Sequence, residues 1–120
     1  MAHYENLPVY KASLDLAIYF EKMVHFFTRY HKYTIGTDLR NASRRILVLV
    51  AKANIKEDRA EALLEALEKL DELKILVKLC KEIKGFRSFR SFEFATKLIV
   101  AVSKQCEGWL KSQNSSSQKP

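Results

Sequence analysis

The chain has little of what a β-sheet, a disulfide framework or a catalytic centre requires. Its 120 residues include three glycines, two prolines, two cysteines and three histidines. Such a composition favours helices over sheets. No apolar run approaches the roughly 20 residues that a membrane-spanning helix needs. The length suits one domain with a single core that is stable without disulfides or metal ions.

The cysteines and the first residues give no sign of export. Residues 1–5 lack the basic and then apolar layout of a signal peptide. Cys80 and Cys106 fall at apolar positions of predicted helices, which favours buried free thiols, with a disulfide between them as the alternative. We therefore expect a cytoplasmic protein.

Positive charge dominates the chain but is unevenly distributed. The formal net charge is +7. Residues 1–56 carry nine bases and four acids, residues 57–72 two bases and seven acids, and residues 73–120 ten bases and three acids. The acids therefore gather at the start of one predicted helix, where they suit its dipole. The remaining surface is positive, which favours a phosphate polymer or an acidic protein as partner.

Apolar residues recur at helical spacing in four segments. The predicted helices cover residues 7–30, 34–54, 59–85 and 89–112. Asn6 and Ser88 are the expected N-caps of the first and last helix, and Gly85 is the expected C′ residue of the third. Short connections predict antiparallel neighbours, so the expected fold is an all-α, up-down-up-down four-helix bundle over residues 1–112. The polar, Ser-rich residues 113–120 are predicted to be a disordered tail.

The predicted core positions follow steps of four and three residues. The first helix has two apolar stripes, which are Leu16, Phe20, Met23, Phe27 and Tyr30, and Tyr10, Leu14, Ala17, Ile18 and Val24. A helix that is apolar over so much of its circumference is either central in a core or also buried by another subunit. The other helices have one face each: Ile35, Leu39, Ala42, Ile46, Leu49 and Ala53; Leu63, Leu67, Leu70, Leu73, Val77 and Cys80; and Phe92, Ala95, Ile99, Val102, Cys106 and Trp109.

Residues with catalytic or metal-binding chemistry do not combine into a site. Glu21 and His25 stand one helical turn apart, but a di-iron bundle needs Glu-x-x-His pairs, and the chain has none. The three histidines all lie within the first 31 residues of the chain, far in sequence from the two cysteines. We therefore predict no catalytic residue, no metal and no cofactor, and a protein that is not an enzyme.

The last helix carries a stripe of bases at seven-residue spacing, Arg90, Lys97, Lys104 and Lys111. The stripe follows one side of the helix for about 30 Å. A stripe of one charge sign attracts a polyanion, although an ordinary solvated face is the alternative. Bases of the second helix would extend it if the two faces adjoin. The predicted nucleic-acid-binding residues are Arg40, Arg44, Arg45, Lys52, Lys74, Lys78, Lys81, Arg90, Lys97, Lys104 and Lys111.

The block Lys84–Phe89 is similar to the start of the aromatic motif of RNA-recognition domains. That motif works on a central β-strand, where its rings stack bases. Here the block falls between two helices and has Arg87 where a small residue is required, so we interpret the match as chance. Two local roles stay open for Phe86 and Phe89: they pin the turn against the core, or they stack a flexible base.

Several short blocks together resemble one known family. They are Asn6–Lys11, Tyr33–Gly36, Leu39–Ala42, Arg59 with the leucines up to Leu73-Lys74, and Glu107–Lys111. Their order and spacing resemble the accessory variability (Avd) proteins of diversity-generating retroelements. They also resemble the related four-helix proteins encoded by intervening sequences of bacterial 23S ribosomal RNA genes. The segment Arg45–Val48 fits the retroelement branch better.

The resemblance implies a function that the residues alone do not give. Avd-like proteins are homopentamers with a basic surface that associate with a reverse transcriptase and its template RNA, and they support mutagenic retrohoming without being polymerases. By location, Arg40, Arg44 and Arg45 match that surface, and the pentamer would bury the second stripe of the first helix. The alternative is a protein-interaction module that uses its basic face for an acidic protein partner. The retroelement function predicts that the protein binds nucleic acid at low salt, whereas the protein-interaction module predicts that it does not.

Overall fold

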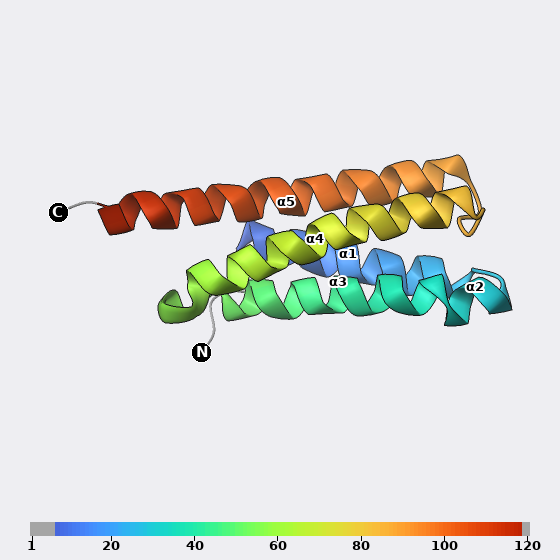
Figure 1. Ribbon diagram of the computed structural model, residues 1–120, viewed down its shortest axis with the longest axis horizontal. Coiled ribbons are helices and arrows are strands. Elements are labelled where there is room, and N and C mark those ends of the chain that lie inside the picture. The colour runs from blue at the N-terminus through green and yellow to red at the C-terminus, as the bar shows by residue number, and fades with distance from the viewer. Residues whose placement is uncertain (1–6, 119–120) are drawn as a thin grey trace.

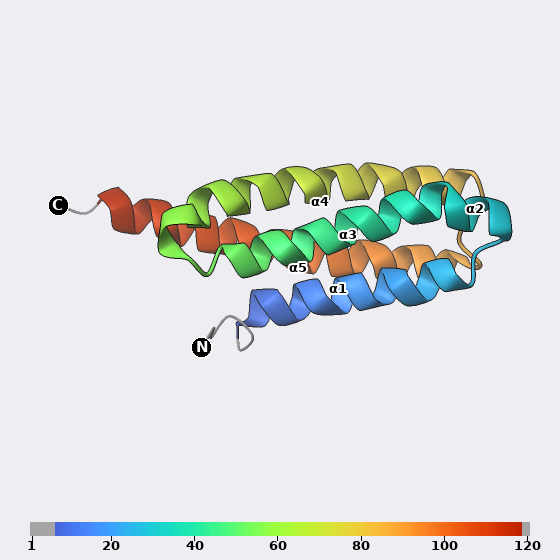
Figure 2. The same ribbon diagram turned by 90° about the horizontal axis from the view of Figure 1, so that it is seen from below.

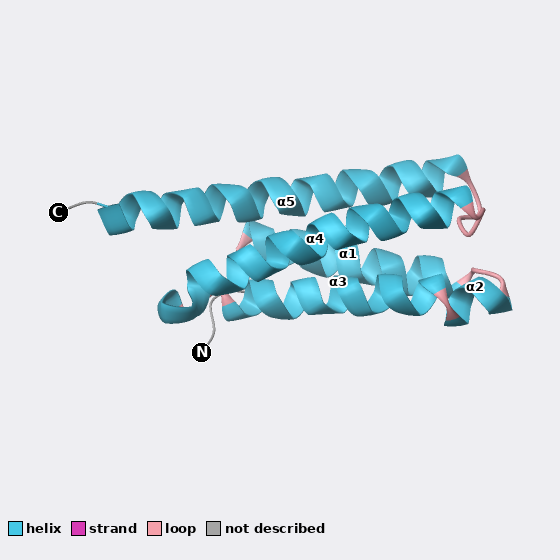
Figure 3. Cartoon of the chain, viewed as in Figure 1, coloured by secondary structure: helices cyan, strands magenta, loops and turns pink. Residues whose placement is uncertain are grey.

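The computed structural model describes residues 7–118, with side chains described for residues 7–113. These residues form the helices α1 (Pro8–His25), α2 (Arg29–Tyr33), α3 (Ile35–Lys52), α4 (Arg59–Glu82) and α5 (Phe89–Gln118), with a short 3-10 helix, η2 (Lys56–Asp58), before α4. Over residues 7–118 the chain contains no strand (Figure 3). The predicted all-α class is confirmed.

Four long helices lie side by side along a molecule that measures 54 × 28 × 20 Å (Figure 1). α3 packs against α1 and α4, and α5 packs against the same two helices. α3 and α5 therefore lie diagonally opposite each other across the core, as do α1 and α4 (Figure 2). The short α2 packs against α3 at the end of the molecule where α4 ends and α5 begins.

The core is built from the predicted faces. All six predicted positions of the second helix are buried, five of them on α3 and the sixth at its C-cap, Ala53. The predicted face of α4 is buried apart from the half-buried Leu67, and that of α5 is buried between the half-buried Phe92 and Trp109. The spacing of four and three residues therefore identified the inward side of these helices, because that spacing keeps side chains on one face.

The first helix is shorter than predicted. α1 ends at His25, and α2 starts at Arg29 after a turn, so the expectation of one helix up to about Tyr30 is wrong. At the break, Phe27 is buried as predicted, and its ring meets the ring of Phe86 edge-on at 5.8 Å between centroids. Tyr30, predicted to lie in the core, is 73% exposed.

The second stripe of α1 is only partly used by the fold. Ala17 and Val24 are buried, whereas Leu14 is 36% and Ile18 is 42% exposed. These two exposed side chains lie one turn apart on the same helix. The single chain thus leaves an apolar pair on the surface of α1.

The turn after α4 is a Schellman motif centred on a lysine. The backbone N–H of Lys84 donates to the carbonyl of Lys81 at 3.0 Å, and that of Gly85 donates to the carbonyl of Cys80 at 2.8 Å. Lys84, with φ of 61°, is the left-handed residue, so the prediction that placed Gly85 at C′ is wrong by one position. Gly85 is needed for packing, because a Cβ there would lie 2.6 Å from the Cys80 Sγ.

The last helix begins as predicted and ends later. The Ser88 Oγ accepts the backbone N–H of Ser91 at 3.2 Å, which confirms the predicted N-cap. α5 continues to Gln118, so residues 113–118 of the predicted tail are helical. That segment contains no glycine or proline, and adding residues to an existing helix is far easier than starting one. The N-cap of α1 is Leu7, so the prediction of Asn6 at that position is wrong by one residue. Asn6 itself and residues 119–120 lie outside the described residues.

Candidate nucleic-acid interface

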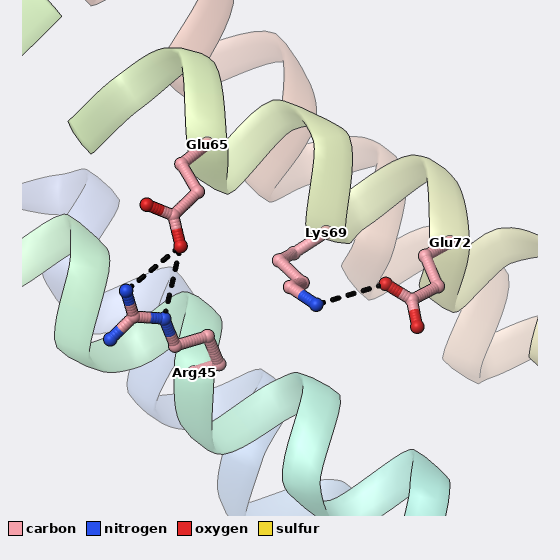
Figure 4. Close-up of polar contacts among 4 residues, drawn as sticks. All are labelled: Arg45, Glu65, Lys69 and Glu72. Atoms are coloured by element: carbon pink, nitrogen blue, oxygen red, sulfur yellow. Dashed lines mark hydrogen bonds and ion pairs between the residues drawn. The ribbon is translucent and has the colours of Figure 1, made fainter. Parts of the chain in front are cut away.

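Two of the predicted arginines on α3 are already paired with carboxylates. Arg44 binds Glu21 of α1 through two hydrogen bonds of 2.5 and 2.9 Å, which raise the pKa of its guanidinium. Arg45 binds Glu65 of α4 at 2.8 Å (Figure 4). Arg40 is half-buried, and its Nε has no hydrogen-bond partner among the described residues. Two of the four predicted bases of α3 are therefore neutralised by carboxylates of the neighbouring helices.

The bases of α3 do not extend the stripe of α5. Lys52 is exposed near the C-terminal end of α3, and Arg44 and Arg45 point to the flanking helices α1 and α4. α3 lies diagonally across the core from α5 (Figure 1). The condition for one continuous basic surface over both helices is therefore not met, because α1 or α4 separates them.

The stripe on α5 is exposed along its length but is not free of acids. Arg90, Lys97, Lys104 and Lys111 are all exposed, and none has an ion-pair partner among the described side chains. An exposed glutamate, Glu93 or Glu107, stands within one turn of each of these bases. The stripe therefore mixes signs at both ends and is purely basic only in its middle.

A stronger concentration of bases lies between α4 and α5. Two neighbouring hollows of about 400 and 230 Å³ share Phe92 as a lining residue. We call them together the α4–α5 groove, which is lined by Lys74, Val77, Lys78, Lys81, Lys84, Phe86, Arg87, Ser88, Phe89, Phe92, Thr96 and Ile99. Five of these residues are basic, and none is acidic. A lining of this kind produces a positive local potential, which attracts polyanions.

The hollow between α3 and α4 shows the contrast. It has a volume of about 460 Å³, and Asp38 and Glu72 line it together with Arg45 and Lys69. Lys69 pairs with Glu72 at 3.2 Å within that lining (Figure 4). Its charges cancel, so size alone does not identify a binding site for a polyanion here.

The lysines of the groove come from one face of α4. Lys74, Lys78 and Lys81 are spaced by four and three residues, so they share the side of α4 that faces α5. Lys74 is 3.6 Å from Asp71 and Lys81 is 3.9 Å from Glu82. Such exposed pairs contribute only about 0–1 kcal/mol, so a phosphate can replace the carboxylate as partner.

Phenylalanines form the apolar part of the groove. The ring of Phe92 lies 6.1 Å from that of Phe86 and 5.6 Å from that of Phe89. Phe86 is half-buried and also meets Phe27, so this residue pins the turn against the core. Phe89 is 60% exposed. Phe86 is therefore packed against the core, whereas Phe89 is exposed to solvent.

Lys84 and Arg87 line the groove but were missing from the predicted binding residues. The signal that identifies them was present in the block Lys84–Phe89, which combines bases and aromatic residues. The Arg87 Nε donates to the carbonyl of Phe26 at the end of α1, at 2.8 Å. Its terminal amino groups have no hydrogen-bond partner among residues 7–113 and belong to an exposed side chain.

The residues considered for metal binding or catalysis have other surroundings. Glu21 pairs with Arg44, and His25 is exposed. Cys80 and Cys106 are free and buried, and burial raises the pKa of both thiols to about 12, with Glu107 adding to the effect at Cys106. Both thiols are therefore protonated and weakly nucleophilic at neutral pH. In the described part of the chain, no three His, Cys, Asp or Glu residues gather as metal ligands would.

Comparison with known proteins finds no relative: no family model and no curated protein matches the chain.

Two of the sequence blocks that resemble the Avd family meet in space, since the Arg59 guanidinium lies over the ring of Trp109, 4.9 Å from its centroid. Arg59 also donates to the carbonyls of Ala53 and Asn54, which ties the start of α4 to the end of α3. Among residues 7–118, no helix has the length and hydrophobicity to cross a membrane.

Proposed function

We propose that this protein is a non-catalytic accessory protein that binds nucleic acid along the α4–α5 groove. The observation that carries the proposal is the lining of this groove, which holds five bases and no acid. Lysine and arginine side chains neutralise phosphates and release counterions, so binding is salt-sensitive and weakly dependent on sequence. The buried, protonated thiols give no support to a nucleophilic enzyme.

The finer part of the proposal follows the resemblance to the Avd family. The four long helices then form an up-down-up-down bundle, which their packing order supports. The partners are a template RNA or its cDNA and a reverse transcriptase, and the role is to support mutagenic retrohoming as a homopentamer. The support is the order of the sequence blocks, together with the contact between Arg59 and Trp109.

Fluorescence anisotropy with a labelled RNA and a labelled DNA tests the proposal. The variant Lys78→Glu/Lys84→Glu removes two exposed groove lysines, neither of which has an ion-pair partner among the described residues. The control Lys11→Glu/Lys22→Glu makes the same change at exposed positions on α1. We expect the groove variant to lose binding at least tenfold more strongly than the control, with unchanged helicity by circular dichroism.

The outcome separates the two candidate functions. Equal losses in both variants would show that net charge, and not the groove, governs binding. If the wild-type protein retains no nucleic acid even at low salt, the proposal is wrong, and an acidic protein becomes the better partner for the groove. Such a partner would use the same lysines, so the two variants would then be compared in a pull-down with that protein.

A further inference from the structure

Phe89 carries an exposed aromatic ring that is not needed to pack the turn against the core. It is the first residue of α5 and is 60% exposed, with its ring 5.6 Å from that of Phe92. The Lys81 Nζ lies 5.7 Å from the same ring. Phe86 already closes the turn against the core, so the ring of Phe89 does not have to do so.

The hollow that holds this ring is lined by bases and by no acid. Phe89 lines the larger hollow together with Lys81, Lys84 and Arg87, and no acidic residue belongs to that lining. An exposed aromatic ring inside a basic groove is the arrangement with which proteins hold single strands. A duplex covers the faces of its bases by stacking them on one another, so it offers such a ring no partner except at an end.

The backbone around Phe89 is held at several points. The Schellman turn fixes Lys84, the Ser88 side chain caps α5, and Arg87 is bonded to the carbonyl of Phe26. A platform that is ordered before binding loses little conformational entropy when a ligand arrives. The exposed side chains of Lys84, Arg87 and Phe89 therefore project from a turn whose shape is already set.

We propose that the larger hollow of the α4–α5 groove is a stacking site for an unpaired nucleotide, and that it makes the protein prefer single-stranded over double-stranded nucleic acid. The Phe89 ring contacts one face of the base, while Lys84 and Arg87 contact the adjacent phosphates. This inference rests on the proposed nucleic-acid binding and adds the strandedness of the ligand and the residue that reads it.

The test uses a single strand with 2-aminopurine near its centre and the duplex formed with its complement, both as RNA and as DNA. We expect tighter binding of the single strand and quenching of 2-aminopurine fluorescence on binding. Phe89→Leu should weaken single-strand binding roughly tenfold, since stacking one base contributes about 1–3 kcal/mol and 1.4 kcal/mol is a factor of ten. Duplex binding should stay unchanged.

Two further variants exclude a general effect of the substitution. Phe89→Tyr keeps an aromatic ring and should keep the affinity for the single strand. Phe94→Leu makes the same exchange at an exposed phenylalanine of α5 whose ring lies 5.0 Å from that of Tyr19 of α1, outside the groove lining, and should leave binding unchanged. If Phe89→Leu binds the single strand as tightly as Phe89→Tyr, the stacking site is refuted.

The design separates this inference from the proposal beneath it. A wild-type protein that binds neither strand nor duplex refutes nucleic-acid binding altogether. A wild-type protein that binds both equally, with no quenching of 2-aminopurine, leaves the basic groove in place and overturns only the stacking site. Comparison of the RNA and DNA strands then shows whether the 2′-hydroxyl affects affinity.

Discussion

At the α4–α5 turn, two adjacent residues are constrained for different physical reasons. Lys84 has a left-handed backbone, a conformation that costs an ordinary residue about 1–2 kcal/mol. Gly85 has no positive φ, but its missing side chain leaves room for the sulfur of Cys80. The glycine therefore serves packing, and the lysine occupies the position where a glycine would be unstrained.

Substitutions at these two positions should act in opposite directions. Gly85→Ala should lower the free energy of unfolding by about 1–3 kcal/mol, because the new Cβ overpacks the buried Cys80 Sγ at 2.6 Å. Lys84→Gly should raise it by about 1 kcal/mol, because glycine adopts a left-handed backbone without strain. Urea denaturation measures both values. A stable Gly85→Ala variant would mean that the turn is looser than its hydrogen bonds indicate.

The α4–α5 groove and the basic stripe of α5 differ in the acids that accompany their bases. The stripe residues Lys97 and Lys104 are exposed, but Glu93 and Glu107 stand within one turn of them. The groove has no acid in its lining. Five bases also gather in the groove, whereas the four bases of the stripe are spread over about 30 Å, so we expect a higher local potential in the groove even though Asp71 and Glu82 stand beside Lys74 and Lys81.

The variant Lys97→Glu/Lys104→Glu tests this ranking. We expect it to weaken nucleic-acid binding, but less than Lys78→Glu/Lys84→Glu does, with helicity retained. For each phosphate of a single strand that a variant no longer neutralises, the slope of log K against log salt should become shallower by about 0.7. Titrations at several salt concentrations give that slope for each variant. Unchanged affinity in the stripe variant would confine binding to the groove, and a greater weakening than in the groove variant would reverse the ranking.

The elements show which parts of this fold the sequence predicts well. The inward faces of α3, α4 and α5 follow from spacing, because burial selects one side of each helix. The break after His25 does not, since neither glycine nor proline marks it in the sequence. The ion pairs of the α3 arginines and the lining of the groove depend on which helices are neighbours in the fold. The spacing of residues within one helix does not predict which helices are neighbours.

For the whole molecule, the exposed apolar pair on α1 leads to a prediction about assembly. Leu14 and Ile18 are partly exposed on one helix, although the stripe to which they belong has the pattern of a buried one. The proposed homopentamer would cover this pair and would place several grooves around one axis. Several grooves on one particle bind a long polyanion more tightly than a single groove, because the later contacts are intramolecular.

Native mass spectrometry measures the assembly directly. We expect a particle of five times the 13.9 kDa chain mass. Ile18→Glu should dissociate it while leaving the helicity of the chain intact, because the side chain is already 42% exposed in the single chain and a charge there would be buried only in the assembly. The matched variant Val48→Glu, at a 54% exposed position on α3, should remain assembled.

A dissociated Ile18→Glu variant should bind a short oligonucleotide as the wild type does and a long RNA more weakly, since only the long RNA spans several grooves. A wild-type protein that is a single chain in solution would refute the pentamer, and the short oligonucleotide would still report on the groove.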